Sequence, residues 1–181
     1  MNTKRCFIAI NLTLEAINEV RKIQKIIESK DLFIGKFTEL KNLHLTLKFL
    51  GEITENNIKK IKERLKQISF GFFEGELENI GVFSEHFIKI IWIELTGNVF
   101  ELQKQIDEKL QDFFEPEKRF MSHITIARVK HVKDKKKLID ILKKINHKKI
   151  KFKIDSFYLM ESELKSEGPV YKVIEKYDLE S

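Results

Sequence analysis

Apolar residues recur along this chain with the period of a helix in four places. Steps of three and four residues place apolar side chains on one helical face, and the first such series is Leu14, Ile17, Val20, Ile23 and Ile27. Similar series fall within 58–68, 99–113 and 138–145. Thr13 and Thr54 stand at the expected N-caps, and Asn98 with Glu101 resembles a capping box. Four amphipathic helices are therefore predicted.

Short apolar or alternating runs predict strands between these helices. The predicted strands cover 5–12, 31–37, 41–50, 70–83, 87–95, 120–129, 149–160 and 170–177. The fourth is interrupted by glycines, the third is expected to end at Gly51, and Gly168-Pro169 is the expected turn between the last two. Several strands follow one another without a helix between them, which favours an α+β fold with antiparallel sheets.

Two tetrapeptides stand out against this pattern, His44-Leu45-Thr46-Leu47 and His123-Ile124-Thr125-Ile126. Residues two apart on a strand share a face, so each histidine points the same way as its threonine. One copy falls in each half of the chain. Together with the element order, the two copies predict a duplicated, two-lobed fold. Its antiparallel sheets face each other across a central cleft, and its helices cover the outer faces.

The whole chain is predicted to be one domain, residues 1–181, because no linker or low-complexity segment divides it. Its 42% hydrophobic and 34% charged residues are typical of a globular protein. The single Cys6 excludes an intramolecular disulfide and any multi-cysteine metal site. No apolar run is long enough for a membrane span and no signal-peptide pattern is present, so a cytoplasmic location is expected.

Paired histidines and threonines suit proton transfer at a phosphate. A neutral imidazole accepts a proton from water near neutral pH, while a protonated one gives a proton to a leaving oxygen. Threonine hydroxyls donate hydrogen bonds to phosphate oxygens. The chemistry requires no metal, and no zinc-binding spacing is present. A single histidine on a strand is more often structural, and we expect His86, His131 and His147 to be surface or loop residues.

A net charge of +6, from 34 basic and 28 acidic residues, favours an anionic partner such as nucleic acid. Solvated lysine-rich helix faces would give the same excess. Charge alone therefore leaves the partner open.

The blocks around both motifs resemble the two-histidine phosphoesterase superfamily, most closely its RNA 2′,3′-cyclic phosphodiesterase branch, also called 2′-5′ RNA ligases. Residues 5–12 resemble its first strand, and 42–51 and 120–128 its two motif blocks. The carboxy-terminal signature is similar at Ser162, Leu164, Gly168, Pro169 and Tyr171. Two positions depart from the family pattern: Ser122 replaces a usual proline and Ile126 a frequent leucine. Proline only sets the approach to the strand, so we expect looser geometry with activity retained.

The resemblance implies hydrolysis of a terminal RNA 2′,3′-cyclic phosphate to a 2′-phosphate. By position, His44 would be the proton donor to the leaving 3′ oxygen and His123 the proton acceptor that activates water. Thr46 and Thr125 would hold the phosphate. The acid–base polarity comes from the resemblance alone. No cofactor or metal is implied. The expected partner is RNA with a cyclic phosphate end, tRNA fragments included, and a monomer that does not bind membranes is expected.

Two further positions stay open as substrate-binding residues. Strict alternation from the second histidine puts Arg128 on the opposite face, so it reaches the phosphate only if the strand ends or bulges near Ala127. The family pattern favours a substrate role for Arg128. Lys48 shares the face of His44 by parity but lies further along the strand. Tyr171 either stacks on a base or packs.

Three alternatives remain at this point. The first is 2′-5′ joining of tRNA halves, which would draw its energy from the cyclic phosphate, since no ATP-binding motif is present. The second is a non-catalytic module that binds RNA ends. The third is hydrolysis of a small cyclic nucleotide or another 2′,5′-linked substrate.

Overall fold

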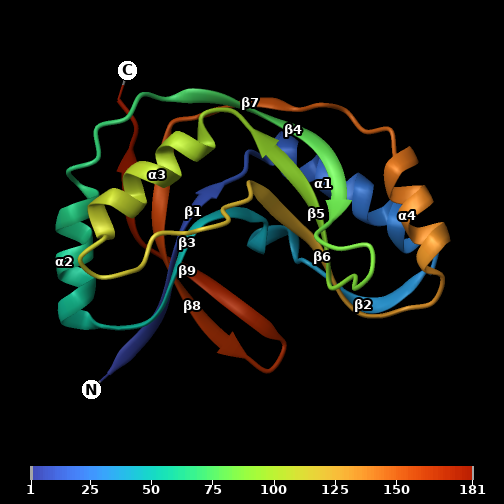
Figure 1. Cartoon of the computed structure of the whole chain (residues 1–181), viewed down its shortest axis with the longest axis horizontal. Helices are drawn as coiled ribbons and strands as arrows, with labels where there is room; N and C mark the ends of the chain where they lie inside the picture. Colours follow the sequence, from blue (N-terminus) through green and yellow to red (C-terminus); the bar gives the residue numbers. More distant parts are fainter. Residues whose placement is uncertain (1, 181) are drawn as a thin grey trace.

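A strongly curved sheet forms an arch in the computed structural model, which describes residues 2–180 (Figure 1). The described residues form four α-helices: α1 (Leu14–Glu28), α2 (Glu55–Leu65), α3 (Val99–Leu110) and α4 (Lys135–Lys144). The strands are β1 (Thr3–Asn11), β2 (Phe33–Phe37), β3 (His44–Thr54), β4 (Phe73–Val82), β5 (Ile90–Thr96), β6 (His123–Val132), β7 (Lys151–Ile154), β8 (Ser156–Lys165) and β9 (Gly168–Asp178). Their order is β7-β4-β5-β6-β3-β1-β8-β9, with β2 paired to β6.

The sheet consists of two antiparallel groups. Strands β1, β3, β8 and β9 form one, and β2, β4, β5, β6 and β7 form the other. The groups meet between the two motif strands, where Leu45 of β3 pairs with Ile124 of β6. The predicted α+β class with facing antiparallel sheets is confirmed. The two sheets are, in addition, continuous through this junction.

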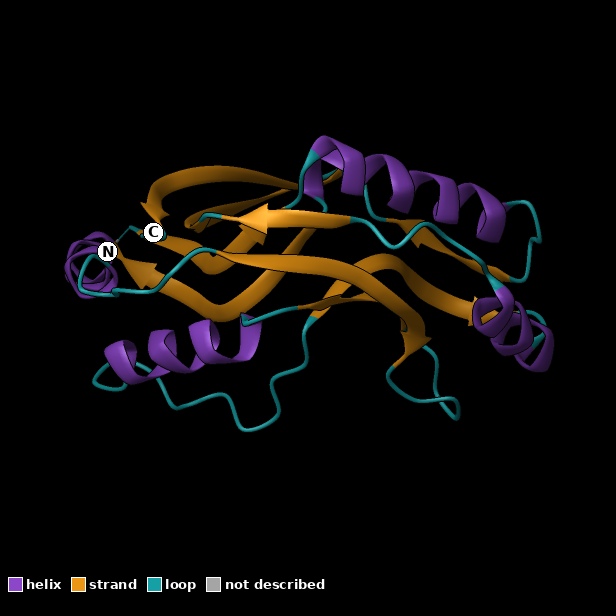
Figure 2. Ribbon diagram, turned by 90° about the horizontal axis from the view of Figure 1, so that it is seen from above, coloured by secondary structure: helices purple, strands orange, loops and turns teal. Residues whose placement is uncertain are grey.

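The lobes do not coincide with the two halves of the sequence. Helix α1 follows β1 but packs on β6, and α3 follows β5 but packs on β3. The last two strands, β8 and β9, return to extend the lobe that begins with β1. Each lobe is therefore built from both halves of the chain, and the helices lie on the outside of the sheet as predicted (Figure 2).

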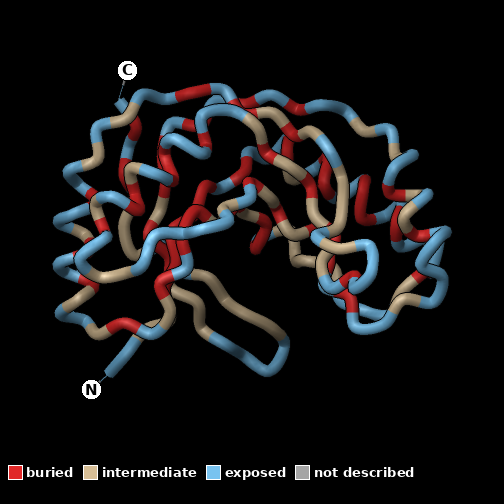
Figure 3. Tube along the Cα trace, in the orientation of Figure 1, coloured by how far each residue is buried: buried red, intermediate tan, exposed pale blue. Residues whose placement is uncertain are grey.

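The core lies between the helices and the outer face of the sheet, where the buried residues in Figure 3 gather along the strands. Ile8 and Ile10 of β1 belong to this core. Their neighbours Phe7 and Ala9 point to the opposite face and form a small second cluster with Met160, against which Tyr171 packs. Alternation along β1 thus builds the core on one side and the wall of the cleft on the other.

Both predicted threonine caps are confirmed, because Thr13 and Thr54 accept hydrogen bonds from backbone amides of the first helical turns. The capping box at Asn98 is wrong: its side chain makes no capping hydrogen bond. The described residues contain no helix with the length and apolar character needed to cross a bilayer.

Three strand predictions need correction. Strand β3 does not end at Gly51, because this glycine adopts φ 72° and lets the strand continue to Thr54. The predicted strand 149–160 is divided at Asp155 into β7 and β8, which pair with opposite lobes. The turn before β9 lies at Ser166 and Glu167, and Gly168 already begins the strand.

Candidate active site

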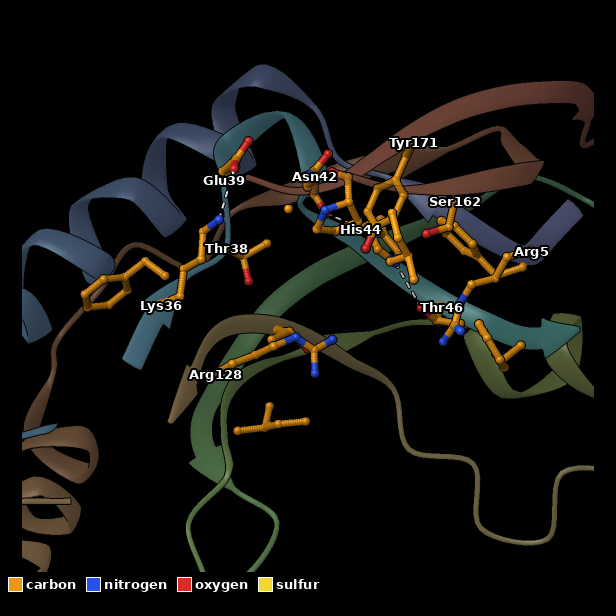
Figure 4. A pocket seen from close by; sticks show the side chains of 18 of the residues that line it. Arg5, Lys36, Thr38, Glu39, Asn42, His44, Thr46, Arg128, Ser162 and Tyr171 are labelled. Carbon is orange, nitrogen blue, oxygen red and sulfur yellow. Dashed lines mark hydrogen bonds and ion pairs between the residues drawn. The ribbon is translucent and has the colours of Figure 1, made fainter. Parts of the chain in front are cut away.

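One cavity of about 560 Å³ brings the two motifs together. Strands β3 and β6 supply its centre, and the β8–β9 hairpin covers one side. Every residue predicted for the site lines it: His44, Thr46, His123, Thr125, Arg128 and Tyr171. Figure 4 shows Arg128 facing His44 and Thr46 from the other side of the cavity. Two polar pairs distant in sequence therefore share one site.

A β-bulge in β3 determines which side chains after the first motif face the cavity. Ala9 of β1 pairs with Thr46 and Ile8 pairs with Lys48, so Leu47 is an extra residue in the strand. An extra residue reverses the alternation of the residues after it. Lys48 is consequently buried behind the sheet, and Phe49 lines the cavity in its place. The prediction that Lys48 shares the face of His44 is wrong for this reason.

The second motif strand has a bulge at the equivalent position. Trp92 of β5 pairs with Thr125 and Ile91 pairs with Ala127, which leaves Ile126 as the extra residue. Strict alternation therefore fails here, and Arg128 turns into the cavity. In both strands the bulge is the third residue after the histidine. The condition on which a cavity position for Arg128 depended, a bulge near Ala127, is met.

Backbone carbonyls fix the two imidazole rings in the same way. His44 Nδ1 donates to the carbonyl of Asn42 at 2.8 Å, and His123 Nδ1 donates to the carbonyl of Met121 at 2.7 Å. When the ring is neutral, a proton held on Nδ1 leaves Nε2 as the basic nitrogen. The Thr46 hydroxyl lies 3.0 Å from His44 Nε2 and donates to it. In each neutral histidine, Nε2 is thus the ring nitrogen without a proton.

The pKa of both histidines lies below the ordinary value of 6.5. Burial is the largest cause in each case, since it disfavours the charged ring. The hydrogen bonds to the backbone carbonyls raise the pKa of each ring, and the positive charge of Arg128 lowers the pKa of both rings. The pKa of His44 is lowered further by the charge of His123. Both rings are therefore mainly neutral at pH 7 until an anion enters the cavity.

Aromatic rings pack against both histidines. The His44 ring lies 4.9 Å from Phe7 and 5.1 Å from Tyr171, the latter edge to face. The His123 ring lies 4.8 Å from Phe83. Burial also raises the pKa of the Tyr171 hydroxyl, so it stays protonated near neutral pH. Tyr171 therefore packs against the His44 ring while lining the cavity.

The sequence did not single out Arg5, Lys36, Asn42 or Phe49 for the site, yet all four line the cavity. Arg5 lies 4.8 Å from the centre of the Phe49 ring, in a cation–π contact. Arg5 and Phe7 lie two residues apart on β1, so alternation places both side chains on the same face. This pattern could have indicated Arg5 as a cavity residue. Asn42 accepts a hydrogen bond from His44 and also makes a second one, because its side-chain amide donates to the Pro169 carbonyl of the β8–β9 hairpin at 2.9 Å.

The other histidines lie apart from the cavity, as predicted. His86 and His131 are exposed, and His147 lies in a loop with Nε2 2.6 Å from the carbonyl of Glu78. Within residues 2–180, no three or more His, Cys, Asp or Glu side chains are grouped so as to hold a metal ion. Ser122, which replaces the expected proline, is buried, and its hydroxyl donates to the Leu95 carbonyl of β5.

The fold and its paired histidine motifs define a two-histidine phosphoesterase. The chain belongs to the family described as "LigT like Phosphoesterase", whose profile matches residues 12–92 and again residues 93–171. The double match agrees with the predicted duplication. It covers nearly the whole chain.

Relatives and solved structures of similar extent support this membership. A Methanocaldococcus jannaschii protein named RNA 2′,3′-cyclic phosphodiesterase is 35% identical, covering 96% of this chain and 99% of its own. A Thermotoga maritima protein of the same name is 33% identical, covering 94% and 92%. TT0787 of Thermus thermophilus superposes with a TM-score of 0.82 at 24% identity over 97% of both chains. E. coli LigT in apo form also gives 0.82, at 19% identity over all of both chains. The two solved structures show the same fold.

Proposed function

We propose that this protein hydrolyses the terminal 2′,3′-cyclic phosphate of RNA to a 2′-phosphate by paired-histidine acid–base catalysis without a metal. The observation that carries the proposal is the arrangement of two His–Thr pairs and Arg128 around one cavity. The names of the relatives, RNA 2′,3′-cyclic phosphodiesterase, support the substrate. The resemblance supplies the acid–base polarity.

The cyclic phosphate binds between the two motif strands. The hydroxyls of Thr46 and Thr125 donate to its non-bridging oxygens, and Arg128 neutralises the charge that develops on them. His123 Nε2 takes a proton from water as the water oxygen attacks phosphorus. His44, protonated on Nε2, gives its proton to the 3′ oxygen as the P–O3′ bond breaks. The 2′-phosphate is left, and the two histidines have exchanged protonation states.

The cavity has room for more than a phosphate. Phe49 lines the cavity and is 52% exposed, so an aromatic ring is accessible there. Such faces stack nucleobases with little sequence preference, and arginine adds a cation–π contribution. Arg5, Lys36 and Arg128 outnumber the one carboxylate of the lining, Glu39, which leaves the cavity basic, as suits an RNA backbone. These features favour an RNA end over a phosphate monoester alone.

Turnover of a synthetic RNA ending in a 2′,3′-cyclic phosphate, in EDTA, tests the proposal. The expected product is a 2′-phosphomonoester that phosphatase removes. A cyclic mononucleotide assayed alongside separates RNA ends from small substrates. Salt-dependent binding without turnover would support the non-catalytic module instead, and a 3′-phosphate product would reverse the assigned cleavage. Joining of tRNA halves in the same buffer would reveal the ligase.

The pH dependence of kcat/KM follows from the lowered pKa values. Activity requires one histidine protonated and the other neutral, so kcat/KM is greatest between the two free-enzyme pKa values. Both lie below 6.5 because of burial, so we expect the maximum on the acid side of pH 6.5. The rate falls above it as the proton donor loses its proton. A kcat/KM profile measured from pH 4 to 9 checks this, and a maximum well above 7 would contradict it.

Phe49→Ala is expected to weaken binding of an RNA end by about 1–3 kcal/mol, the usual contribution of stacking one base. KM for the oligonucleotide should rise while kcat changes little, because the aromatic rings that pack against the imidazoles are Phe7, Tyr171 and Phe83 and not Phe49. Phe87→Ala is the matched control, since Phe87 is also an exposed phenylalanine but does not line the cavity. Equal KM values for the Phe49→Ala variant and the wild type would remove Phe49 from the binding site.

A further inference from the structure

A buried ion pair lies behind the cavity, directly after the first motif. Lys48 of β3 places Nζ 2.5 Å from Asp107 Oδ1 of α3, with side chains only 4% and 9% exposed. Lys48 also donates to the carbonyl of Glu115 at 2.9 Å. The bulge at Leu47 is what turns this lysine away from the cavity. Lys48 therefore does not line the cavity and is not expected to bind substrate.

Asp107 connects the pair to the segment that leads to the second motif. Its Oδ2 accepts hydrogen bonds from Gln103 Nε2 and from the backbone amide of Glu117, each at 2.8 Å. Residues 111–122 belong to no helix or strand. Hydrogen bonds from side chains therefore help to fix the conformation of this segment. Lys48 and Asp107 hold it at two backbone groups, the Glu115 carbonyl and the Glu117 amide.

The far end of the same segment orients His123. The Ser122 hydroxyl donates to the Leu95 carbonyl, and the Met121 carbonyl accepts the hydrogen bond from His123 Nδ1 at 2.7 Å. The segment is thus tied at 115–117 and at 122, and the acceptor for His123 lies between the two ties. A displacement of the Met121 carbonyl would change which ring nitrogen carries the proton and where Nε2 points.

Burying this ion pair costs free energy, because a lysine and a carboxylate lose their hydration. Only an ion pair of good geometry offsets that loss. Apolar residues would fill the same space between β3 and α3. We propose that the Lys48–Asp107 pair positions His123. The pair connects β3, the strand of His44, to the segment 111–122, whose Met121 carbonyl orients the His123 ring. Its effect on catalysis rests on the function proposed above. Its effect on the His123 ring does not.

The double variant Lys48→Met/Asp107→Leu tests the proposal, because replacing both partners by apolar residues often preserves stability. We expect a folded protein in which kcat for the cyclic end falls about 10- to 100-fold with KM nearly unchanged, as for a misplaced catalytic group. Nitrogen-15 NMR should show loss of the single Nδ1–H tautomer at His123. His44, held locally by Asn42, is the internal reference and should keep its tautomer.

Two comparisons keep the result decisive. The control Lys4→Met/Glu161→Leu removes a different ion pair, at 2.9 Å between strands β1 and β8, and should leave kcat and the His123 tautomer unchanged. Glu117→Pro removes the backbone donor to Asp107 at an exposed residue and leaves the ion pair intact. It should shift kcat and the tautomer in the same direction by a smaller factor, even if the double variant fails to fold.

Wild-type kcat and an unchanged His123 tautomer in the folded double variant would overturn the proposal. Glu117→Pro with both properties unchanged would overturn it as well. If the wild type does not open a cyclic phosphate, the proposed function fails, and the tautomer comparison still decides whether the pair positions His123.

Discussion

Replacing His44 or His123 by alanine is expected to lower kcat for opening a 2′,3′-cyclic phosphate by about 10²- to 10⁴-fold each. In the proposed mechanism each ring supplies one proton transfer. Neither can substitute for the other, because a backbone carbonyl holds each ring on its own strand, and the Thr46 hydroxyl holds His44 in addition. Single-turnover rates on a labelled RNA end, measured in EDTA, check the prediction. Melting temperatures show whether each variant still folds.

A substrate with a better leaving group separates the two roles. An aryl phosphodiester such as bis(p-nitrophenyl) phosphate releases an alcohol that needs no proton. If His44 is the donor, His44→Ala should keep much more of its activity on the aryl ester than His123→Ala does. The opposite ranking would exchange the two roles. His131→Ala, an exposed change on the same strand as His123, serves as control, and full activity in either active-site variant would refute the mechanism.

Arg128→Met is expected to lower kcat/KM by about 10²- to 10³-fold, the usual loss when one preorganised donor to a developing oxyanion is removed. The variant should also move the pH profile upward, because Arg128 lowers the pKa of both histidines. Lys130→Met removes a positive charge two residues further along β6, outside the cavity, and is the matched control. A profile that keeps its position in Arg128→Met would show that this guanidinium does not face the rings.

Much of the site could be predicted because it depends on local alternation. His44 with Thr46, and His123 with Thr125, needed only the period of a strand and a shared cavity. Alternation fails after Leu47 and Ile126, where a bulge adds one residue. Whether a strand bulges depends on its register with the neighbouring strand, which the motif itself does not encode. Alternation alone therefore places Lys48 on the cavity face and Phe49 on the opposite face, whereas the structure has them the other way round.

The fold followed the same division. Threonine caps and amphipathic helices are local, and they were predicted well. The assignment of helices to lobes is not local, since α1 lies against β6 and α3 against β3. Asp155 divides one apolar run into β7 and β8 because the two pieces pair with different partners. Periodicity alone cannot reveal that choice, which tertiary pairing makes.

The junction at Leu45 and Ile124 has a mechanical consequence. Each of these residues directly follows a histidine, so the joint between the two groups of strands lies next to both motif histidines. The ladder between β1 and β3, by contrast, extends from Thr3 to Asn11. Bending at the joint would change the separation of His44 and His123, while each histidine would keep its own threonine. The separation of the two histidines therefore depends on the shortest strand pairing in the sheet.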